Sequence, residues 1–268
     1  MKKIHIVIMA IALIGAGTGG SFMLLQPTGD EREPNEPMNE KIKLPEPKYD
    51  GNISVEQALL ERRSVRAYKD GPLTLNEVSQ LLWAAQGITN SRRMFRTAPS
   101  AGALYPLDVH IVIGDVEEVT NGVYKYRPQQ HELVKVRNGN VRDKLAIAAL
   151  GQTCVGEGAI VIVFSAVYER TTQKYGNRGI RYVHMEAGHA AQNVFLQAVS
   201  LNLGMVVVGA FKDDEVRKIL NMSDKEQPLY IVPVGRILIR IRVCGVRPQY
   251  WICITHQRTE LNKSSNKR

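Results

Sequence analysis

The stretch that most constrains this chain runs from residue 180 to residue 211. Gly204 is placed to end a helix there, and the apolar run Met205–Val208 follows before Gly209 interrupts it. Within the helix, Gly188 would let another backbone come close. The pattern predicts a buried helix and an apolar glycine turn, which would form either a wall for a flat cofactor or simply the core of a domain. The apolar positions recur at steps of three and four, as on one helix face: Val183, Ala187, Ala190, Val194, Ala198 and Leu201.

Composition places the chain among globular proteins. It has 268 residues, of which 44% are hydrophobic and 23% are charged, enough for one domain with a substantial core. The net charge of +9 is concentrated near the C-terminus, where eight basic residues and one acid follow from Arg236 onward. The body is therefore close to neutral, and a surface that binds nucleic acid is not expected.

A metal centre is also not expected. Cys154, Cys244 and Cys253 show neither metal-ligand spacing nor a disulfide framework. His184 and His189 are five positions apart, so on a helix they point about 140° away from each other and cannot bind one metal together.

The N-terminal segment predicts contact with a membrane. Lys2 and Lys3 precede the uncharged run Ile4–Leu25, whose length of roughly 20 residues suits a transmembrane helix. A signal peptide with cleavage near Gly15–Gly17 is the alternative. We favour an anchor at residues 1–25, because no clear cleavage site follows. The body would then lie outside the cytoplasm, anchored, or secreted if the segment is removed.

Two further segments flank the predicted domain. Residues 26–52 are rich in Pro, Glu, Lys and Asn without an apolar period, which predicts a disordered linker. The folded domain is expected from residue 53 to residue 236. Residues 237–268 form a basic tail, which we interpret either as a domain-swapped arm or as an accidental extension of the reading frame.

The domain itself mixes helices and strands. Ser54 with Gln57, and Thr74 with Glu77, have the spacing of capping boxes and predict two helix starts. Further helices are expected at 141–150 and from 213 to 220, and strands at 109–113, 123–126, 133–136, 159–166 and 229–234, with a polar connection at 169–178.

Two short segments carry candidate binding residues. Arg62, Arg63, Ser64 and Arg66 bring three guanidinium groups and a hydroxyl together, as a phosphate site requires, although a solvated basic turn is the alternative. The loop Pro99–Pro106 is made of small residues that let backbone amides approach a ligand. No nucleophile elbow, Walker loop or Rossmann fingerprint is present. A planar cofactor with a phosphate tail suits these segments best.

Several motifs in order carry a family resemblance. They resemble the nitroreductase superfamily, and within it the branch related to the azoline dehydrogenases of ribosomal peptide maturation. The resemblance covers roughly residues 53–236. The motifs are Arg62–Tyr68, Pro99–Pro106, Gly122–Tyr126, Glu186–Asn193 and Pro233–Arg236.

The resemblance implies an α+β fold with a central, mostly antiparallel sheet flanked by helices, and FMN held at the interface of a homodimer. By analogy, Arg62, Arg63, Ser64 and Arg66 would hold the phosphate and ribityl chain, with Arg236 beside them. The flavin ring would be lined by Pro99, Ser100, Ala101 and Gly102 of the other subunit, and by the backbone of Val208, Gly209 and Ala210. Gln192 is a further candidate contact, or a side chain that satisfies a neighbouring backbone group.

The implied activity is that of an FMN-dependent oxidoreductase. It would transfer hydride or electrons between a donor, with NAD(P)H as a candidate, and a small-molecule or peptide-borne acceptor. One alternative is an azoline dehydrogenase acting with a cyclisation partner, and another is a membrane-tethered basic binding protein without flavin. Azoline dehydrogenases use an adjacent Lys-Tyr pair, which Lys174 and Tyr175 resemble. The alternative for this pair is a solvated surface turn.

Overall fold

The computed structural model describes residues 40–238, and in them one antiparallel sheet organises the fold. Its strand order is β1-β7-β6-β5-β8-β10-β2, with β9 also paired to β10. These strands are β1 (Lys41–Lys43), β2 (Tyr68–Lys69), β5 (Leu107–Ile113), β6 (Gly122–Arg127), β7 (Glu132–Asn138), β8 (Ile160–Ala166), β9 (Leu203–Met205) and β10 (Gln227–Ile237), and a separate pair joins β3 (Ile88–Asn90) to β4 (Phe95–Arg96). The predicted α+β architecture is confirmed.

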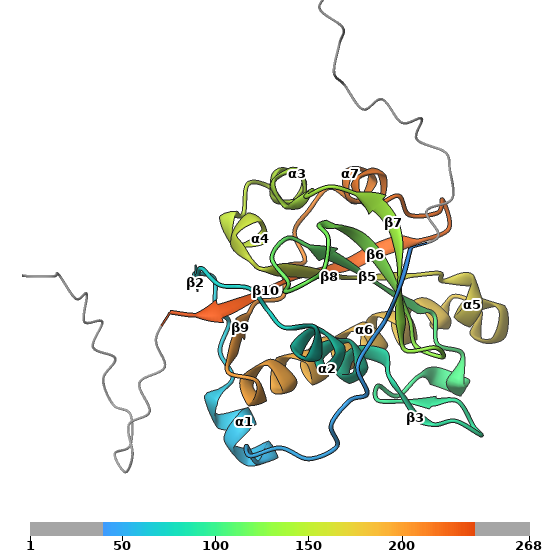
Figure 1. The fold of residues 1–268 in the computed structure, drawn as a ribbon. Helices are drawn as coiled ribbons and strands as arrows, with labels where there is room; N and C mark the ends of the chain where they lie inside the picture. Colours follow the sequence, from blue (N-terminus) through green and yellow to red (C-terminus); the bar gives the residue numbers. More distant parts are fainter. Residues whose placement is uncertain (1–39, 239–268) are drawn as a thin grey trace, which may run out of the picture. The chain divides into compact units, whose positions relative to one another are not determined.

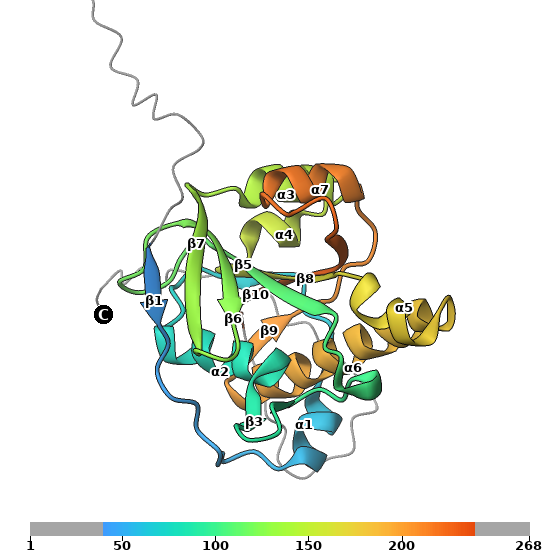
Figure 2. The same cartoon turned by 90° about the vertical axis from the view of Figure 1, so that its right-hand side faces the viewer.

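Helices cover both faces of the sheet, as Figures 1 and 2 show. On one face lie α1, α2 and α6, and on the other α3, α4 and α7, with α5 beside the start of α6. Every residue of β8 is buried, because this strand lies in the middle of the sheet between two helical layers. The helices are α1 (Val55–Glu61), α2 (Leu75–Gln86), α3 (Arg142–Ala148), α4 (Thr153–Glu157), α5 (Glu169–Tyr175), α6 (Arg178–Ser200) and α7 (Asp213–Ile219).

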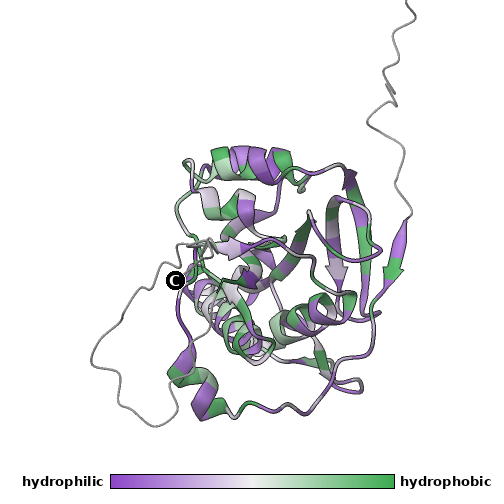
Figure 3. Cartoon of the chain, turned by 60° about the vertical axis from the view of Figure 1, so that its left-hand side comes forward, coloured by the Kyte–Doolittle hydropathy of each residue, from purple (hydrophilic) through white to green (hydrophobic). Residues whose placement is uncertain are grey.

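The longest of these helices is the one that the sequence predicted first. In α6 the buried positions follow the expected period, and hydrophobic and hydrophilic segments alternate along the helices in Figure 3. The helix ends at Ser200, before Gly204, and Asn202 takes the left-handed conformation with φ of 58°. Gly204 belongs instead to β9, where an added Cβ would lie 2.7 Å from a methyl group of Val65.

The close approach that was expected at Gly188 occurs at a different glycine of α6. Among the described residues, nothing lies within 4 Å of a Cβ added at Gly188. A Cβ added at Gly179 would stand 3.0 Å from backbone atoms of Thr172, so the ends of α5 and α6 meet at Gly179.

The helix starts are largely as predicted. Thr74 and Glu77 form a complete capping box at α2. At α1, Ser54 accepts a hydrogen bond from the backbone N–H of Gln57 at 3.1 Å, but the side chain of Gln57 donates to Glu61 instead. The second half of the capping box is therefore absent there.

Two segments differ from the sequence prediction. Residues 40–48, expected in a disordered linker, include β1, which pairs with β7, and the buried Leu44. A single apolar side chain among prolines gives no period, so tertiary pairing decides this segment. The polar connection after β8 contains α5, whose polar outer face hid it from a search for apolar periodicity.

The expectation of a membrane-spanning helix needs correction. Across residues 40–238, no helix is long and apolar enough to cross a bilayer. The longest, α6, carries Arg178, Arg181 and Glu186. The predictions of a transmembrane helix and of a membrane-anchored protein are therefore corrected. The run Ile4–Leu25 and the tail from residue 239 lie outside the described residues.

Leu44 tests whether the segment around β1 belongs to the folded domain. Its side chain is 2% exposed, so Leu44→Ala should lower the free energy of unfolding by about 2–4 kcal/mol through lost burial and a cavity. Leu150→Ala is the control, because Leu150 is 61% exposed. Urea denaturation of both variants decides the question. Equal, small losses would mean that the segment adds nothing to the core.

Candidate functional site

The loop that begins at Pro99 meets the Lys-Tyr pair directly. Gly102 has φ of 63°, a left-handed conformation that favours glycine. A Cβ added there would lie 2.8 Å from the Tyr175 hydroxyl and 3.1 Å from the Lys174 Nζ. The structure thus brings together two segments that are about 70 residues apart in sequence, and Gly102 leaves the room in which the pair's two polar ends sit.

The pair lies at the C-terminal end of α5. Lys174 is exposed and Tyr175 is partly buried. The Lys174 Nζ lies 5.4 Å from the centre of the Tyr175 ring, and this ring packs edge-on against Tyr182 of α6 at 5.2 Å. An ammonium beside a phenol can pass a proton, so the geometry allows general acid–base chemistry at the Tyr175 hydroxyl.

An ion-pair network fixes α5 to the sheet. Arg170 of α5 donates to both carboxylate oxygens of Asp108 on β5, at 3.0 and 3.1 Å. Lys125 donates to Asp108 at 3.1 Å and to Glu226 at 3.0 Å. His110 Nε2 lies 2.7 Å from Glu226. This chain of charges holds the helix that carries Lys174 and Tyr175.

Burial and electrostatics oppose each other at Glu226. Burial disfavours its charge, but His110 and Lys125 more than compensate and hold the pKa of this carboxyl well below its usual range. The stabilisation from Glu226 is therefore complete at neutral pH, and it is lost only as the pH falls below the ordinary carboxylate range.

Sequence reasoning missed a polar cluster beneath the Pro99–Gly102 loop. Glu186 of α6 is 2% exposed and faces Ser100, Gln86 and Arg96. Burial raises the pKa of Glu186 to about 7, while the nearby Ser100 and Gln86 side chains and the charge of Arg96 oppose the shift. The available signal was a glutamate on the apolar side of the helix, directly before Ala187.

The arginine cluster lies at the other end of α6. Arg62 stacks on the Phe195 ring at 5.1 Å, and Arg63 donates to the backbone carbonyls of Leu60 and Arg62 at 2.9 and 2.7 Å. Ser64 and Arg66 are exposed. Two of the four candidates therefore already make contacts within the chain, while Ser64 and Arg66 face solvent.

The turn after β9 offers fewer backbone groups than expected. The N–H of Val208 donates to Ile231 at 2.8 Å, and its carbonyl accepts from the same residue at 2.9 Å. Gly209 and Ala210 are exposed, and within residues 40–238 their N–H groups make no hydrogen bond. Those two amides are the ones available to a ligand.

Arg236 and Gln192 also have definite surroundings. The guanidinium of Arg236 donates to both carboxylate oxygens of Glu77, at 2.5 and 2.8 Å, and to the carbonyl of Pro72 at 2.8 Å. To bind a phosphate as predicted, Arg236 would have to give up these hydrogen bonds to Glu77 and Pro72. Gln192 is half-buried on α6, and its neighbour Asn193 donates to the Thr97 carbonyl at 3.2 Å.

The two groups of candidates lie at opposite ends of α6. Phe195, under Arg62, and Glu186, under Ser100, are nine residues apart, which is about 13 Å along a helix. One chain therefore brings Gly102 to Lys174 and Tyr175, while the start of the same loop follows α6 toward the arginine cluster, where Asn193 donates to the Thr97 carbonyl.

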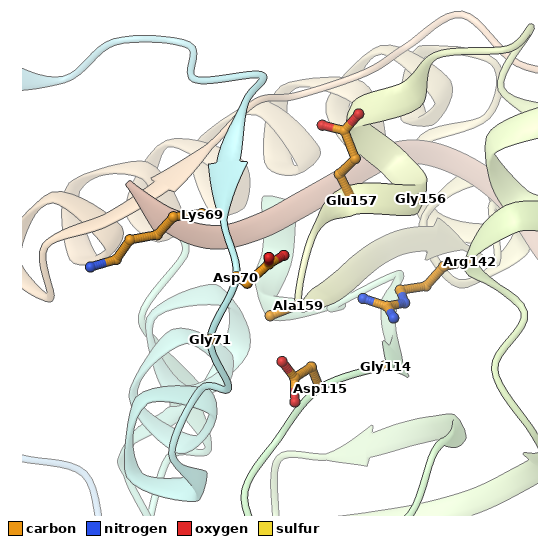
Figure 4. A pocket seen from close by; sticks show the side chains of 9 residues that line it. All are labelled: Lys69, Asp70, Gly71, Gly114, Asp115, Arg142, Gly156, Glu157 and Ala159. Atoms are coloured by element: carbon orange, nitrogen blue, oxygen red, sulfur yellow. The ribbon is translucent and has the colours of Figure 1, made fainter. Parts of the chain in front are cut away.

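A polar hollow of about 300 Å³ lies elsewhere, where β2, the turn after β5 and α4 meet. Figure 4 shows Asp70, Asp115 and Arg142 around its opening. Lys69, Glu157, Ala159 and three glycines complete the lining, so none of the candidate residues contributes to it. In residues 40–238, no group of three or more His, Cys, Asp or Glu side chains could hold a metal ion.

An antiparallel sheet with helices on both faces, and with candidate binding residues along α6, defines an α+β class of protein. The chain belongs to the nitroreductase family, which matches residues 59–236. This confirms the resemblance and the activity class that it implies, an oxidoreductase of the nitroreductase type.

Particular relatives refine the placement. MJ1384 of Methanocaldococcus jannaschii, which is named as a nitroreductase, is 53% identical over 184 residues, 69% of this chain and 91% of its own length. The microcin B17-processing protein McbC of Escherichia coli is 28% identical over 158 residues, 57% of this chain and 58% of its own. This relationship supports the branch related to peptide maturation.

Solved structures agree. The E. coli microcin synthetase McbBCD complex with truncated pro-MccB17 bound has a chain that matches 71% of this one and 75% of its own length, with 26% identity and a TM-score of 0.57. A nitroreductase structure from Anabaena variabilis matches 75% of this chain with 33% identity and a TM-score of 0.66. This chain spans 42% of that protein and 58% of McbC.

Arg236 allows a test between a structural role and a phosphate-binding role. Arg236→Ala should lower the free energy of unfolding by about 1–3 kcal/mol, because Glu77 loses a bidentate, partly buried partner. Glu77→Gln, which keeps the capping box, should cost a similar amount, and the double variant should cost little more than either. Denaturant titration of the three proteins measures this. Additive losses would contradict the pairing.

Proposed function

We propose that this protein is an FMN-dependent oxidoreductase in which Lys174 and Tyr175 transfer protons at the substrate. The observation that carries the proposal is the placement of both side chains against Gly102, in a chain of the nitroreductase family. Family membership supports the oxidoreductase class, and the choice of FMN rests on the residues around α6.

Those residues fit a flavin in part. Ser64 and Arg66 face solvent and offer a hydroxyl and a guanidinium to a phosphate. The N–H groups of Gly209 and Ala210 are exposed and suit the polar edge of a ring. Arg62, Arg63, Val208 and Arg236 would contribute only by exchanging contacts that they already make. Bound FMN would supply a ring that accepts and gives up hydride.

We further propose a homodimer as the functional unit. The part of α6 under the Pro99–Gly102 loop lies about 13 Å along the helix from the part under the arginine cluster, and in the proposed dimer the loop of one chain would approach the cluster of the other. Large apolar side chains also remain exposed on this side of the molecule. They are Val55, Leu59 and Leu60 on α1, and Ile180 and Met185 on α6.

A narrower candidate is azoline dehydrogenation on a modified peptide. Similarity to McbC, a protein named for microcin B17 processing, supports it, together with the Lys174–Tyr175 pair. Removing hydride from a thiazoline or oxazoline ring also requires a proton to leave, and a Tyr175 phenolate, stabilised by the Lys174 ammonium, would accept that proton. If the reaction runs as a reduction instead, NAD(P)H is our proposed donor.

The first experiment measures flavin and mass together. The purified protein should show flavin absorbance, one FMN per chain and the sedimentation of a dimer. A flavin-loaded monomer would contradict the dimer, and reconstitution with excess FMN that leaves no bound flavin would overturn the function.

Substitution of Arg66 tests whether this side chain binds the FMN phosphate. Arg66→Ala should weaken FMN binding about 10- to 100-fold, since one charge-assisted hydrogen bond contributes roughly 1.5–3 kcal/mol. Arg92→Ala, at another exposed arginine, is the matched control.

The Lys-Tyr pair should act on turnover rather than on flavin binding. Tyr175→Phe and Lys174→Ala should each retain FMN yet turn over an azoline-bearing peptide at least about 100-fold more slowly, as expected when a proton-transfer group is lost. Tyr49→Phe and Lys144→Ala, at exposed positions, are matched controls. Full turnover by both variants of the pair would remove its catalytic role.

A further inference from the structure

The cluster beneath the Pro99–Gly102 loop contains buried polar atoms that no other group satisfies. Within residues 40–238, Gln86 Nε2, Arg96 Nε and Glu186 Oε1 are buried without a hydrogen-bond partner. Two are donors and one is an acceptor, so they are complementary in kind. Buried polar groups without partners are destabilising and rare, which points to a role other than stability.

Ser100 connects this cluster to the loop. Its hydroxyl oxygen accepts from the Tyr105 N–H at 2.9 Å, which closes the loop on itself. The same side chain faces Glu186, where hydrogen bonding by Ser100 favours the ionised carboxylate. Gly102, two residues further on, meets Lys174 and Tyr175. Glu186 is therefore one side chain away from the backbone that contacts the pair.

We propose that Glu186 is a positioning residue, whose charge state sets the conformation of the Pro99–Gly102 loop through Ser100 and thereby the fit of Gly102 against Lys174 and Tyr175. The effect of Glu186 on the conformation of the loop does not depend on any cofactor. The effect of Glu186 on turnover rests on the proposed function.

The cluster has different partners in the two charge states. An ionised Glu186 accepts hydrogen bonds, so it holds the Ser100 hydroxyl and balances Arg96. A neutral Glu186 carries one proton to donate, and Arg96 then depends on Gln86 Oε1 at 2.8 Å and on the Tyr105 ring at 4.4 Å. The loop between Arg96 and Tyr105 is thus held differently in each state.

The opposing influences on Glu186 place this change near neutral pH. Burial favours the neutral form, whereas Ser100, Arg96 and Gln86 favour the charged one, and the resulting pKa is about 7. Arg96 of β4 is the charged group that faces Glu186, while α2 and the loop present the neutral Gln86, Ser100 and Tyr105. A change of one pH unit therefore alters the charge of the cluster substantially.

The first test needs no flavin. Hydrogen exchange of the amides at residues 100–105, corrected to intrinsic rates, should give protection factors that change by at least about 5-fold across a midpoint near pH 7. Glu186→Gln should abolish this pH dependence, and Glu118→Gln, at an exposed position, should keep it. A pH-independent loop in the unaltered protein, or an unchanged midpoint in Glu186→Gln, would overturn the proposal.

The Ser100→Ala variant tests whether Glu186 acts on the loop through Ser100, without altering Glu186 itself. This variant keeps the carboxyl group, so the infrared carbonyl band of Glu186 should still titrate, while the protection of residues 100–105 should no longer follow pH. If that protection still follows pH in Ser100→Ala, the connection through Ser100 is wrong, whatever becomes of Glu186→Gln.

The second test concerns the pair. On the substrate that Tyr175→Phe fails to turn over, Glu186→Gln should lose the limb of the kcat–pH profile near pH 7, with KM altered less than about 2-fold. Loss of flavin from the unaltered protein would refute the proposed function but leave the exchange result valid. A kcat limb that persists in Glu186→Gln would refute the effect on Lys174 and Tyr175.

Discussion

The packing of α6 across one face of the antiparallel sheet is the interaction on which the rest of the structure depends. Small residues on its buried side, such as Ala187, Ala190 and Ala198, let the helix lie close to the sheet. Larger groups are placed at the ends, with Phe195 under Arg62 and Glu186 under Ser100. One helix therefore sets the separation between the two candidate half-sites.

That separation has a chemical consequence. The proposed acid–base pair, Lys174 and Tyr175, lies on α5, which is tied to β5 through Arg170 and Asp108 and contacts α6 at Gly179. The exposed Ser64 and Arg66 lie beside β9, at the far end of α6. The proposed acid–base pair and the proposed anion-binding residues therefore lie on different elements, and a substitution in one group can leave the other group in place.

The sequence predicted the strands and helices wherever an apolar period was strong. The central helix, β8 and the β6–β7 hairpin were found because each buries a regular face. It missed α5, whose face is mainly polar, and β1, which has no buried residue and is followed by the single buried Leu44. Both elements form through contacts with distant parts of the chain, which no local period encodes.

The site was predictable as a set of segments, but not as a set of contacts. Family resemblance marked Arg236 and Val208, yet the first binds Glu77 and the second pairs with Ile231. Such pairings join residues far apart in sequence, as in the 159-residue separation of Glu77 and Arg236. Single-sequence patterns carry no information about them. The placement of Gly102 against Lys174 and Tyr175 is long-range in the same way.

Two buried glutamates show how the same residue type serves different ends in this fold. Glu226 has two partners, His110 and Lys125, which lower its pKa, so it is ionised at neutral pH and stabilises the sheet. Glu186 is opposed by a single guanidinium that is itself shared with Gln86, and burial raises its pKa to about 7. The number of compensating charges separates the two cases. A carboxylate with full compensation acts as a fixed anchor for α5, whereas one with partial compensation can change its charge beneath the loop that meets Lys174 and Tyr175.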